Sequence, residues 1–137
     1  MTDEDAPLRQ AADTIGPPEL AAIRVREQDG ILVIVISGEI DISNVERLAD
    51  VIHAQPNAED GLVVDLSEVS YLDSSAVSLL HDLAHRLRQR TQPMVVVSTS
   101  GSVPRRVLEL TAFETNAPLT EDLEAAVRLL AGGSARP

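Results

Sequence analysis

The chain has 137 residues, of which 22 are acidic and 11 basic, so its formal net charge is -11. This length fits one domain with its own core, and the acidic balance argues against sequence-independent binding to nucleic acid or to anionic membrane. The chain has no cysteine, which excludes disulfides and thiolate metal sites, and its core must be aliphatic because it has one Tyr, one Phe and no Trp.

The two ends of the chain differ from its middle. Residues 1–20 are acidic, contain Pro17-Pro18 and show no apolar period, so we expect a flexible acidic tail. Residues 132–137, "GGSARP", predict a disordered C-terminal tail, which leaves one domain over residues 21–131. The first residues lack the pattern of a signal peptide, and the longest apolar run, "ILVIVI", is far shorter than the roughly 20 residues of a membrane span. We therefore expect a soluble, cytoplasmic protein.

The first predicted elements are two strands. Residues 22–26 form a short, half-apolar strand candidate, and Asp29-Gly30 is a hairpin signal. The run "ILVIVIS", residues 31–37, is rich in β-branched residues and predicts a buried strand. This hairpin predicts one antiparallel pair at the start of the sheet.

A first helix is predicted after "GEID". Its apolar residues recur at the helical spacing i, i+3, i+4, i+7, at Val45, Leu48, Ala49 and Ile52. Ser43, with Glu46 three residues later, fits a capping box at its start.

Two more strands and a long helix follow. The runs "LVVDL", residues 62–66, and "MVVVST", residues 94–99, predict buried strands. A helix is predicted between them, from about Ser74 to Arg90, and its arginines at the end suit the negative helix C-terminus. From its apolar period, Leu80 and Leu83 are expected to face the sheet, and His81 and Arg88 to face solvent.

The last third of the chain repeats the alternation of strand and helix. A short helix is predicted near residues 103–112, with Ser102 or Val103 as its cap. Residues 115–119 predict a last short strand, and a final helix is expected to start at Thr120 and to stop at Gly132-Gly133.

This alternation predicts an α/β fold: a mixed, mainly parallel sheet of about four to five strands covered by about four helices. Sites in such sheets lie at the carboxyl ends of the strands. Two polar groups are predicted there: Glu39 and Asp41 after one strand, and the segment 73–75 at the start of the long helix.

The segment Asp73-Ser74-Ser75 has two interpretations. Either serine, or Asp73, could simply cap the helix, a contribution of about 1 kcal/mol. Alternatively, a serine here is a phosphorylation site, because a phosphate would meet free N–H groups and the positive end of the helix dipole. The residues alone leave both interpretations open.

Two motifs carry a resemblance that bears on this choice. "GEID" at residues 38–41 and "DLSEVSYLDSSA" at residues 65–76, in that order, resemble the STAS domain of bacterial anti-sigma factor antagonists. The resemblance spans roughly residues 21–131 and implies the STAS fold.

In that family the first hydroxyl after the aspartate is the phosphate acceptor, which implies Ser74 here, with Ser75 as the alternative. Asp73 matches the neighbouring acidic residue, and Asp41 matches the aspartate of the first motif. Ala76 stands where the family usually has Gly. By resemblance, these five residues form the partner-binding site.

The resemblance implies a bacterial binding switch that regulates transcription, for example in a stress response, and not an enzyme. The unphosphorylated protein, a monomer when free, would bind an anti-sigma factor that is often also a serine kinase, and so release a sigma factor. Phosphorylation would end the binding and a serine phosphatase would restore it, with no cofactor held by the protein itself. Two alternatives remain: a domain that docks its partner constitutively, and a sensor of a small ligand or nucleotide.

Other chemistry has weak support in the sequence. His81 lies seven residues after Ser74, about 10 Å along a helix, too far to activate it as a nucleophile. His81 and His85 have the i, i+4 spacing of metal ligands, but a solvated helix face is the better interpretation and no third ligand is apparent. Asp41 and Asp73 could form a carboxylate pair, yet no basic group or phosphate-binding glycine loop accompanies them.

Overall fold

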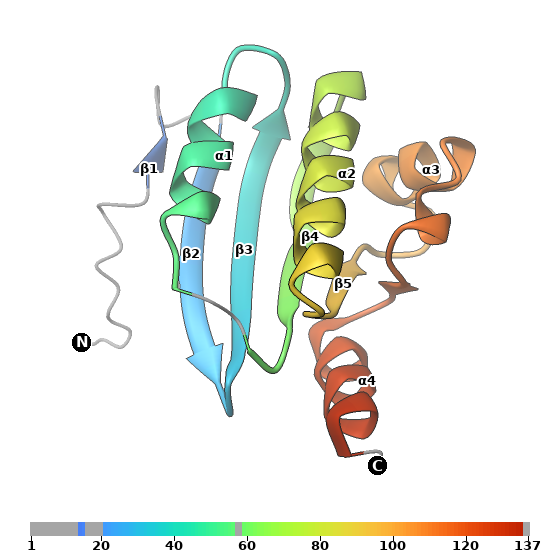
Figure 1. Cartoon of the computed structure of the whole chain (residues 1–137). Helices are drawn as coiled ribbons and strands as arrows, with labels where there is room; N and C mark the ends of the chain where they lie inside the picture. The colour runs from blue at the N-terminus through green and yellow to red at the C-terminus, as the bar shows by residue number, and fades with distance from the viewer. Residues whose placement is uncertain (1–13, 16–20, 57–58, 136–137) are drawn as a thin grey trace, which may run out of the picture.

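The computed structural model describes residues 14–15, 21–56 and 59–135, and its strands lie in one sheet in chain order (Figure 1). The strands are β1 (Thr14–Ile15), β2 (Ala21–Gln28), β3 (Ile31–Ile40), β4 (Leu62–Leu72), β5 (Met94–Val97) and β6 (Leu119–Thr120). β2 pairs antiparallel with β1 and β3, whereas the pairs from β3 to β6 are parallel. The predicted α/β class is confirmed; the described sheet has six strands because a two-residue strand lies at each edge.

The turn between β2 and β3 confirms the predicted hairpin. Asp29 and Gly30 both have left-handed backbone conformations, with φ of 53° and 82°. Two such residues form the tight turn whose twist matches the twist of the flanking strands. The pair Gln28–Ile31 closes the ladder next to this turn.

The helices cover both faces of the sheet. They are α1 (Val45–His53), α2 (Ser74–Gln89), α3 (Val103–Leu110) and α4 (Leu123–Ala135), with a short 3-10 helix, η2, at Phe113–Thr115. α1 and α2 lie side by side in front of the sheet in Figure 1, and the core on this face also includes buried residues of α3 and η2. The other face of the sheet packs against α4.

The run "ILVIVI" lies in β3 and supplies both cores. Side chains alternate between the two faces of a strand, so Ile34 and Ile36 pack toward α1 and α2, while Val33 and Val35 pack on the face that α4 covers. This is why the strand is apolar at successive positions rather than at alternate ones.

β4 is longer than predicted. It runs to Leu72, whereas the sequence pattern indicated a strand over residues 62–66 only. Register shifts interrupt the pairing of β4 with β3, and Asp65 lies buried in the strand and accepts a hydrogen bond from the Ser67 N–H at 2.9 Å. Because of these irregularities, the exposed residues of the second half, such as Ser67 and Glu68, do not follow a regular alternation.

Several predicted helix ends differ from the structure. α1 begins at Val45 with Asn44 as its N-cap, and Ser43 instead donates to the Asp41 carboxylate, so the predicted capping box is wrong. α3 has the predicted Ser102 cap, whose Oγ accepts from the Arg105 N–H. After α3, Ala112 adopts φ 56°, the left-handed conformation that glycine usually supplies at such an end.

α4 does not stop at the glycines. It begins at Leu123 and continues through Gly132-Gly133 to Ala135, so the expected C-terminal tail over residues 132–137 is helical as far as 135. A glycine inside a helix costs only about 1 kcal/mol relative to alanine. The burial of Ala126 and Leu130 in the preceding turns of α4 outweighs this cost.

Most of the predicted N-terminal tail, residues 1–20, lies outside the described residues. Its described part, Thr14–Ile15, pairs with Ala21 and Ala22 of β2.

One face of α2 was predicted correctly and one residue was not. Leu80 and Leu83 are buried against the sheet, and Arg88 is exposed, as expected. His81 was predicted to face solvent, but it is half-buried and its ring lies edge-on to Phe113, with ring centroids 5.4 Å apart. That contact joins residues 32 positions apart, so no helical period could indicate it.

We predict that Leu83→Ala lowers the free energy of unfolding by about 2–5 kcal/mol, because it leaves a cavity in the core. His81→Ala should cost about 0.5–1.5 kcal/mol through the lost ring contact. Ser78→Ala, an exposed position on the same helix, is the control and should stay within about 0.5 kcal/mol. Urea unfolding measures all three, and a cost for Leu83→Ala as small as that of the control would contradict the packing.

Candidate functional site

The parallel pairing of β3 and β4 brings two aspartates to one edge of the sheet. Ile40 and Leu72 are partners at the ends of these strands, and Asp41 and Asp73 follow them directly. The backbone also joins these ends, because the Asp73 N–H donates to the Ile40 carbonyl at 3.2 Å. The register therefore brings both aspartates to the carboxyl edge of the sheet, as the sequence indicated.

Asp73 is the N-cap of α2. Its Oδ1 accepts from the Ser75 N–H at 2.9 Å and from the Ala76 N–H at 3.2 Å. These are two of the N–H groups that a helix start leaves without intrahelical partners. The sequence left the choice of capping residue open, and in the structure it is Asp73. Its carboxylate partly occupies the N–H groups that were expected to be free for a phosphate.

The second carboxylate oxygen of Asp73 reaches the neighbouring loop. Asp73 Oδ2 accepts from the Ile42 N–H at 3.2 Å. One carboxylate therefore ties the start of α2 to the turn after β3, across 31 positions of sequence.

Hydrogen bonds to this carboxylate lower the pKa of Asp73. Burial acts in the opposite direction by raising it, but donation from Ser75, Ala76 and Ile42 outweighs the burial. Asp73 is therefore ionised at neutral pH.

The two serines have different surroundings. The Ser75 hydroxyl donates to Asp73 Oδ1 at 2.5 Å, a short charge-assisted bond, and the residue is half-buried. Ser74 is exposed, and its hydroxyl has no hydrogen bond to the residues that the structure describes. Ser74 thus presents its hydroxyl to solvent, while Ser75 uses its own within the cap.

The turn after β3 is pinned by its own polar side chains. Asp41 Oδ1 accepts from the Ser43 N–H at 2.9 Å and from its hydroxyl. Asn44 is 3% exposed; its side chain accepts from the Asp41 N–H at 3.1 Å and donates to the Glu39 carbonyl at 2.8 Å. Sequence reasoning missed Asn44, although a polar residue directly before an apolar helical period is a signal for such a turn.

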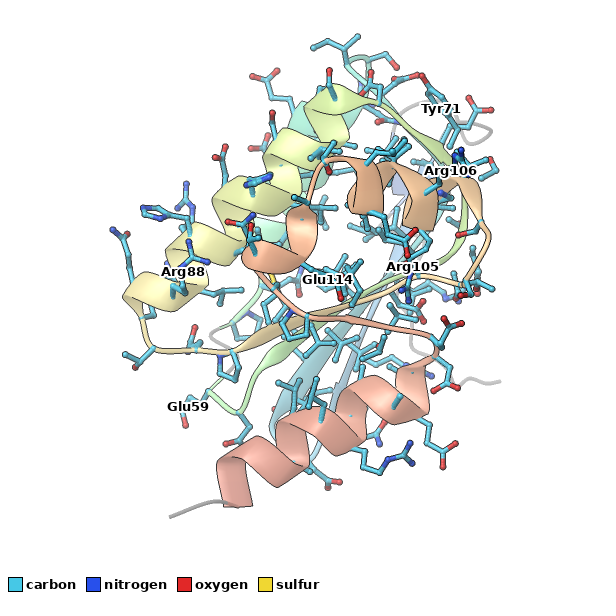
Figure 2. All side chains as sticks on the ribbon, turned by 90° about the vertical axis from the view of Figure 1, so that its right-hand side faces the viewer. Glu59, Tyr71, Arg88, Arg105, Arg106 and Glu114 are labelled. Carbon is cyan, nitrogen blue, oxygen red and sulfur yellow. The ribbon has the colours of Figure 1, made fainter. Side chains whose placement is uncertain are left out.

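The same edge of the sheet is held by Arg105 on the side of α3. Its guanidinium donates to the Ser98 carbonyl at 2.8 Å and to the Thr120 carbonyl at 3.0 Å, at the ends of β5 and β6. Glu109 and Glu121 lie within 3.7 Å of it. In Figure 2, Arg106 of α3 and Tyr71 of β4 are labelled near each other, which agrees with the packing of α3 against β4. Arg105 thus links the ends of β5 and β6, and its charge is already paired with two carboxylates.

Neither a cluster of metal-ligating residues nor a membrane-spanning helix is found in the part of the chain that the structure describes. It contains no cluster of three or more His, Cys, Asp or Glu residues able to hold a metal ion. No helix within it has the length and hydrophobicity needed to cross a bilayer.

Comparison with known proteins identifies the family of this chain. Residues 22–126 match the sequence model of the STAS domain. The chain belongs to the STAS domain family.

The relatives that this STAS domain resembles are regulators. It is 30% identical over 120 residues to the anti-sigma-F factor antagonist RsfB of Mycobacterium tuberculosis, covering 85% of this chain and 94% of that protein. It is 27% identical over 105 residues to the anti-sigma-B factor antagonist of Staphylococcus aureus, covering 74% and 94%. An anti-sigma factor antagonist from Mycobacterium paratuberculosis has a similar structure, with a TM-score of 0.75 at 29% identity over 85% of this chain and 99% of that one.

Four of the five predicted partner-binding residues of the STAS domain have solvent access. Asp41, Asp73 and Ser75 are half-buried and Ser74 is exposed. Ala76 is 1% exposed, so its methyl group packs in the core. Its N–H donates a hydrogen bond to the capping Asp73 carboxylate.

The serines make a matched pair for a stability test. Ser75→Ala removes the hydroxyl bond to Asp73 and should lower the free energy of unfolding by about 0.5–1.5 kcal/mol. Ser74→Ala removes an exposed hydroxyl and should change it by less than about 0.5 kcal/mol. Thermal and urea unfolding measure both, and a larger cost for Ser74→Ala would mean that Ser74 is the capping hydroxyl.

Proposed function

We propose that this protein is an anti-sigma factor antagonist whose binding ends when Ser74 is phosphorylated. In the unphosphorylated form it binds an anti-sigma factor and so frees a sigma factor for transcription. The names of its relatives support the general role. The exposed Ser74 hydroxyl, held at a capped helix start beside an ionised carboxylate, is the observation that supports the switch.

Ser74 suits a kinase better than Ser75 does. A kinase must bring the γ-phosphate of ATP to a hydroxyl that can turn toward it, and Ser75 is held by Asp73 in a short hydrogen bond. In the transfer, Ser74 Oγ bonds to the γ-phosphorus, the bond from that phosphorus to the ADP oxygen breaks, and the hydroxyl proton passes to a base of the kinase. The protein is thus a substrate in this reaction and not the catalyst.

The added phosphate changes the surface much more than the fold. It brings roughly two negative charges to an edge where Asp41 and Asp73 already lie, on a chain with a net charge of -11. Asp73 already accepts from the N–H groups of Ser75 and Ala76, so the phosphate must compete with this carboxylate for those donors. A partner that fits the unmodified edge would have to desolvate this charge, which weakens binding.

The remaining parts of the proposal follow from this scheme. The partner is an anti-sigma factor that is also a serine kinase, and a serine phosphatase restores the active form. The protein works in the bacterial cytoplasm as a monomer when free. Residues 1–20 act as a tail that is not needed for binding.

The partner can be identified with paired baits. Wild-type protein and a variant with phosphoserine placed at position 74 are used to capture proteins from lysate of the source organism. The proposal requires an anti-sigma factor that the wild-type bait retains and the phosphoserine bait does not. The captured anti-sigma factor is then purified, and its dissociation constants for the wild type and the variants are measured.

We predict that this anti-sigma factor and ATP phosphorylate the wild type and Ser75→Ala but not Ser74→Ala. Ser74→Ala should bind the partner with the wild-type dissociation constant, because it loses only an exposed hydroxyl. Ser74→Glu should bind more weakly, although one charge reproduces only part of the effect of phosphate. Mass spectrometry and calorimetry measure these outcomes.

Three results would contradict the proposal. Phosphate that survives Ser74→Ala and disappears in Ser75→Ala would move the site by one residue. Binding that is intact and insensitive to phosphoserine at position 74 would indicate a constitutive docking domain. A melting temperature that responds to a small ligand or nucleotide, without capture of an anti-sigma factor, would indicate a sensor.

A further inference from the structure

Ile42 is an apolar side chain that the fold leaves in solvent. It is 76% exposed, although it lies between two polar residues in a turn whose backbone is pinned. Exposed apolar residues are common one at a time, but this one lies at the same sheet edge as Ser74. Its N–H is bonded to Asp73, the residue directly before Ser74.

The Asp73 carboxylate connects Ile42 to the phosphorylation site. Oδ1 accepts hydrogen bonds from N–H groups at the start of α2, and Oδ2 accepts one from the Ile42 N–H. The carboxylate therefore cannot leave the helix cap without changing its bond to the turn. A new anion on Ser74 both repels this carboxylate and competes with it for the N–H groups of Ser75 and Ala76.

We propose that Ile42 is the apolar anchor that the anti-sigma factor binds, and that Asp73 transmits the phosphorylation state of Ser74 to it. This inference rests on the proposed function and adds its mechanism. In the unmodified protein, Asp73 holds the turn so that Ile42 is presented in one position. Phosphoserine displaces the carboxylate, the Ile42 N–H loses its acceptor, and the anchor is no longer preorganised.

The surroundings of Ile42 define the chemistry of the partner. An apolar anchor needs a pocket that excludes water, with polar contacts around its rim. On this side the rim is acidic, with Asp41 directly before Ile42 in the chain and Asp73 hydrogen-bonded to its N–H. The matching surface of the anti-sigma factor is therefore an apolar pocket flanked by arginine or lysine.

The link from Ser74 to Ile42 can be tested on the isolated protein. Hydrogen exchange at the amide of Ile42, followed by nitrogen-15 NMR, is compared in the wild type, Asp73→Asn and the protein with phosphoserine at position 74. Asparagine caps a helix as well as aspartate does, but it has one acceptor oxygen, so it keeps the cap and loses the bond to Ile42. Both altered proteins should show severalfold faster exchange at Ile42 than the wild type, with the amides of α2 from Val77 onward unchanged. An Ile42 amide that does not respond to phosphoserine would overturn the link.

The anchor is tested by a matched pair of exposed apolar residues. Leu110, at the end of α3, is also 76% exposed. Ile42→Ala should weaken binding of the purified anti-sigma factor about tenfold or more, as truncation of an interface anchor does, and Leu110→Ala should change it less than about twofold. Equal effects of the two substitutions, or no effect of Ile42→Ala, would overturn the anchor.

These measurements separate the inference from the function on which it rests. If phosphoserine at position 74 abolishes binding while the Ile42 amide is unchanged, the switch works through charge alone and the link is wrong. If the Ile42 amide responds but the phosphoserine protein binds as tightly as the wild type, the proposed switch is wrong and so is the role of Ile42 in it.

Discussion

The Asp73 carboxylate joins three parts of this protein that are distant in sequence. It caps α2 through the N–H groups of Ser75 and Ala76, and it holds the turn after β3 through Ile42. It can do both because the register of β3 and β4 sets Ile40 opposite Leu72, so the two loops begin side by side. The sheet fixes the place of the candidate site, and this carboxylate fixes its shape.

This arrangement separates the requirements of the fold from those of the proposed switch. The hydroxyl of Ser75 donates a hydrogen bond to the capping Asp73. The hydroxyl of Ser74 is exposed and has no hydrogen-bond partner among the described residues. A charge on Ser74 therefore disturbs neither the cores on the two faces of the sheet nor Arg105 at the ends of β5 and β6. Such a residue can change a binding surface at little cost in stability.

Much of the fold was predictable from local patterns. The apolar runs of β3 and β5, the Asp29-Gly30 turn and the apolar period of α2 each follow from side-chain direction and turn chemistry. The second half of β4 was not predictable, because register shifts interrupt its alternation and leave polar residues exposed. The contact of His81 with Phe113 was also missed, since only the tertiary fold brings these residues together.

The candidate site was predicted in outline from the order of its residues. The two aspartates and two serines follow from strands that end at one edge, and the resemblance to anti-sigma factor antagonists indicated Ser74. Which aspartate caps the helix, which serine is free and where Ile42 points depend on bonds across 31 positions of sequence. No local pattern carries that information.

The ionised Asp73 carboxylate holds the start of α2 and the turn after β3 together. Carbon-13 NMR of the Asp73 carboxyl group during an acid titration tests it most directly. The pKa should lie below the ordinary aspartate value, because three residues donate hydrogen bonds to the carboxylate. The stability that it contributes is then present above the unfolded-state pKa and is lost as pH falls through the lowered folded-state pKa. The amide protons of Ile42, Ser75 and Ala76 should shift with the same midpoint. An ordinary pKa, or an Ile42 amide that does not respond to the titration while those of Ser75 and Ala76 do, would show that Asp73 does not join these two segments.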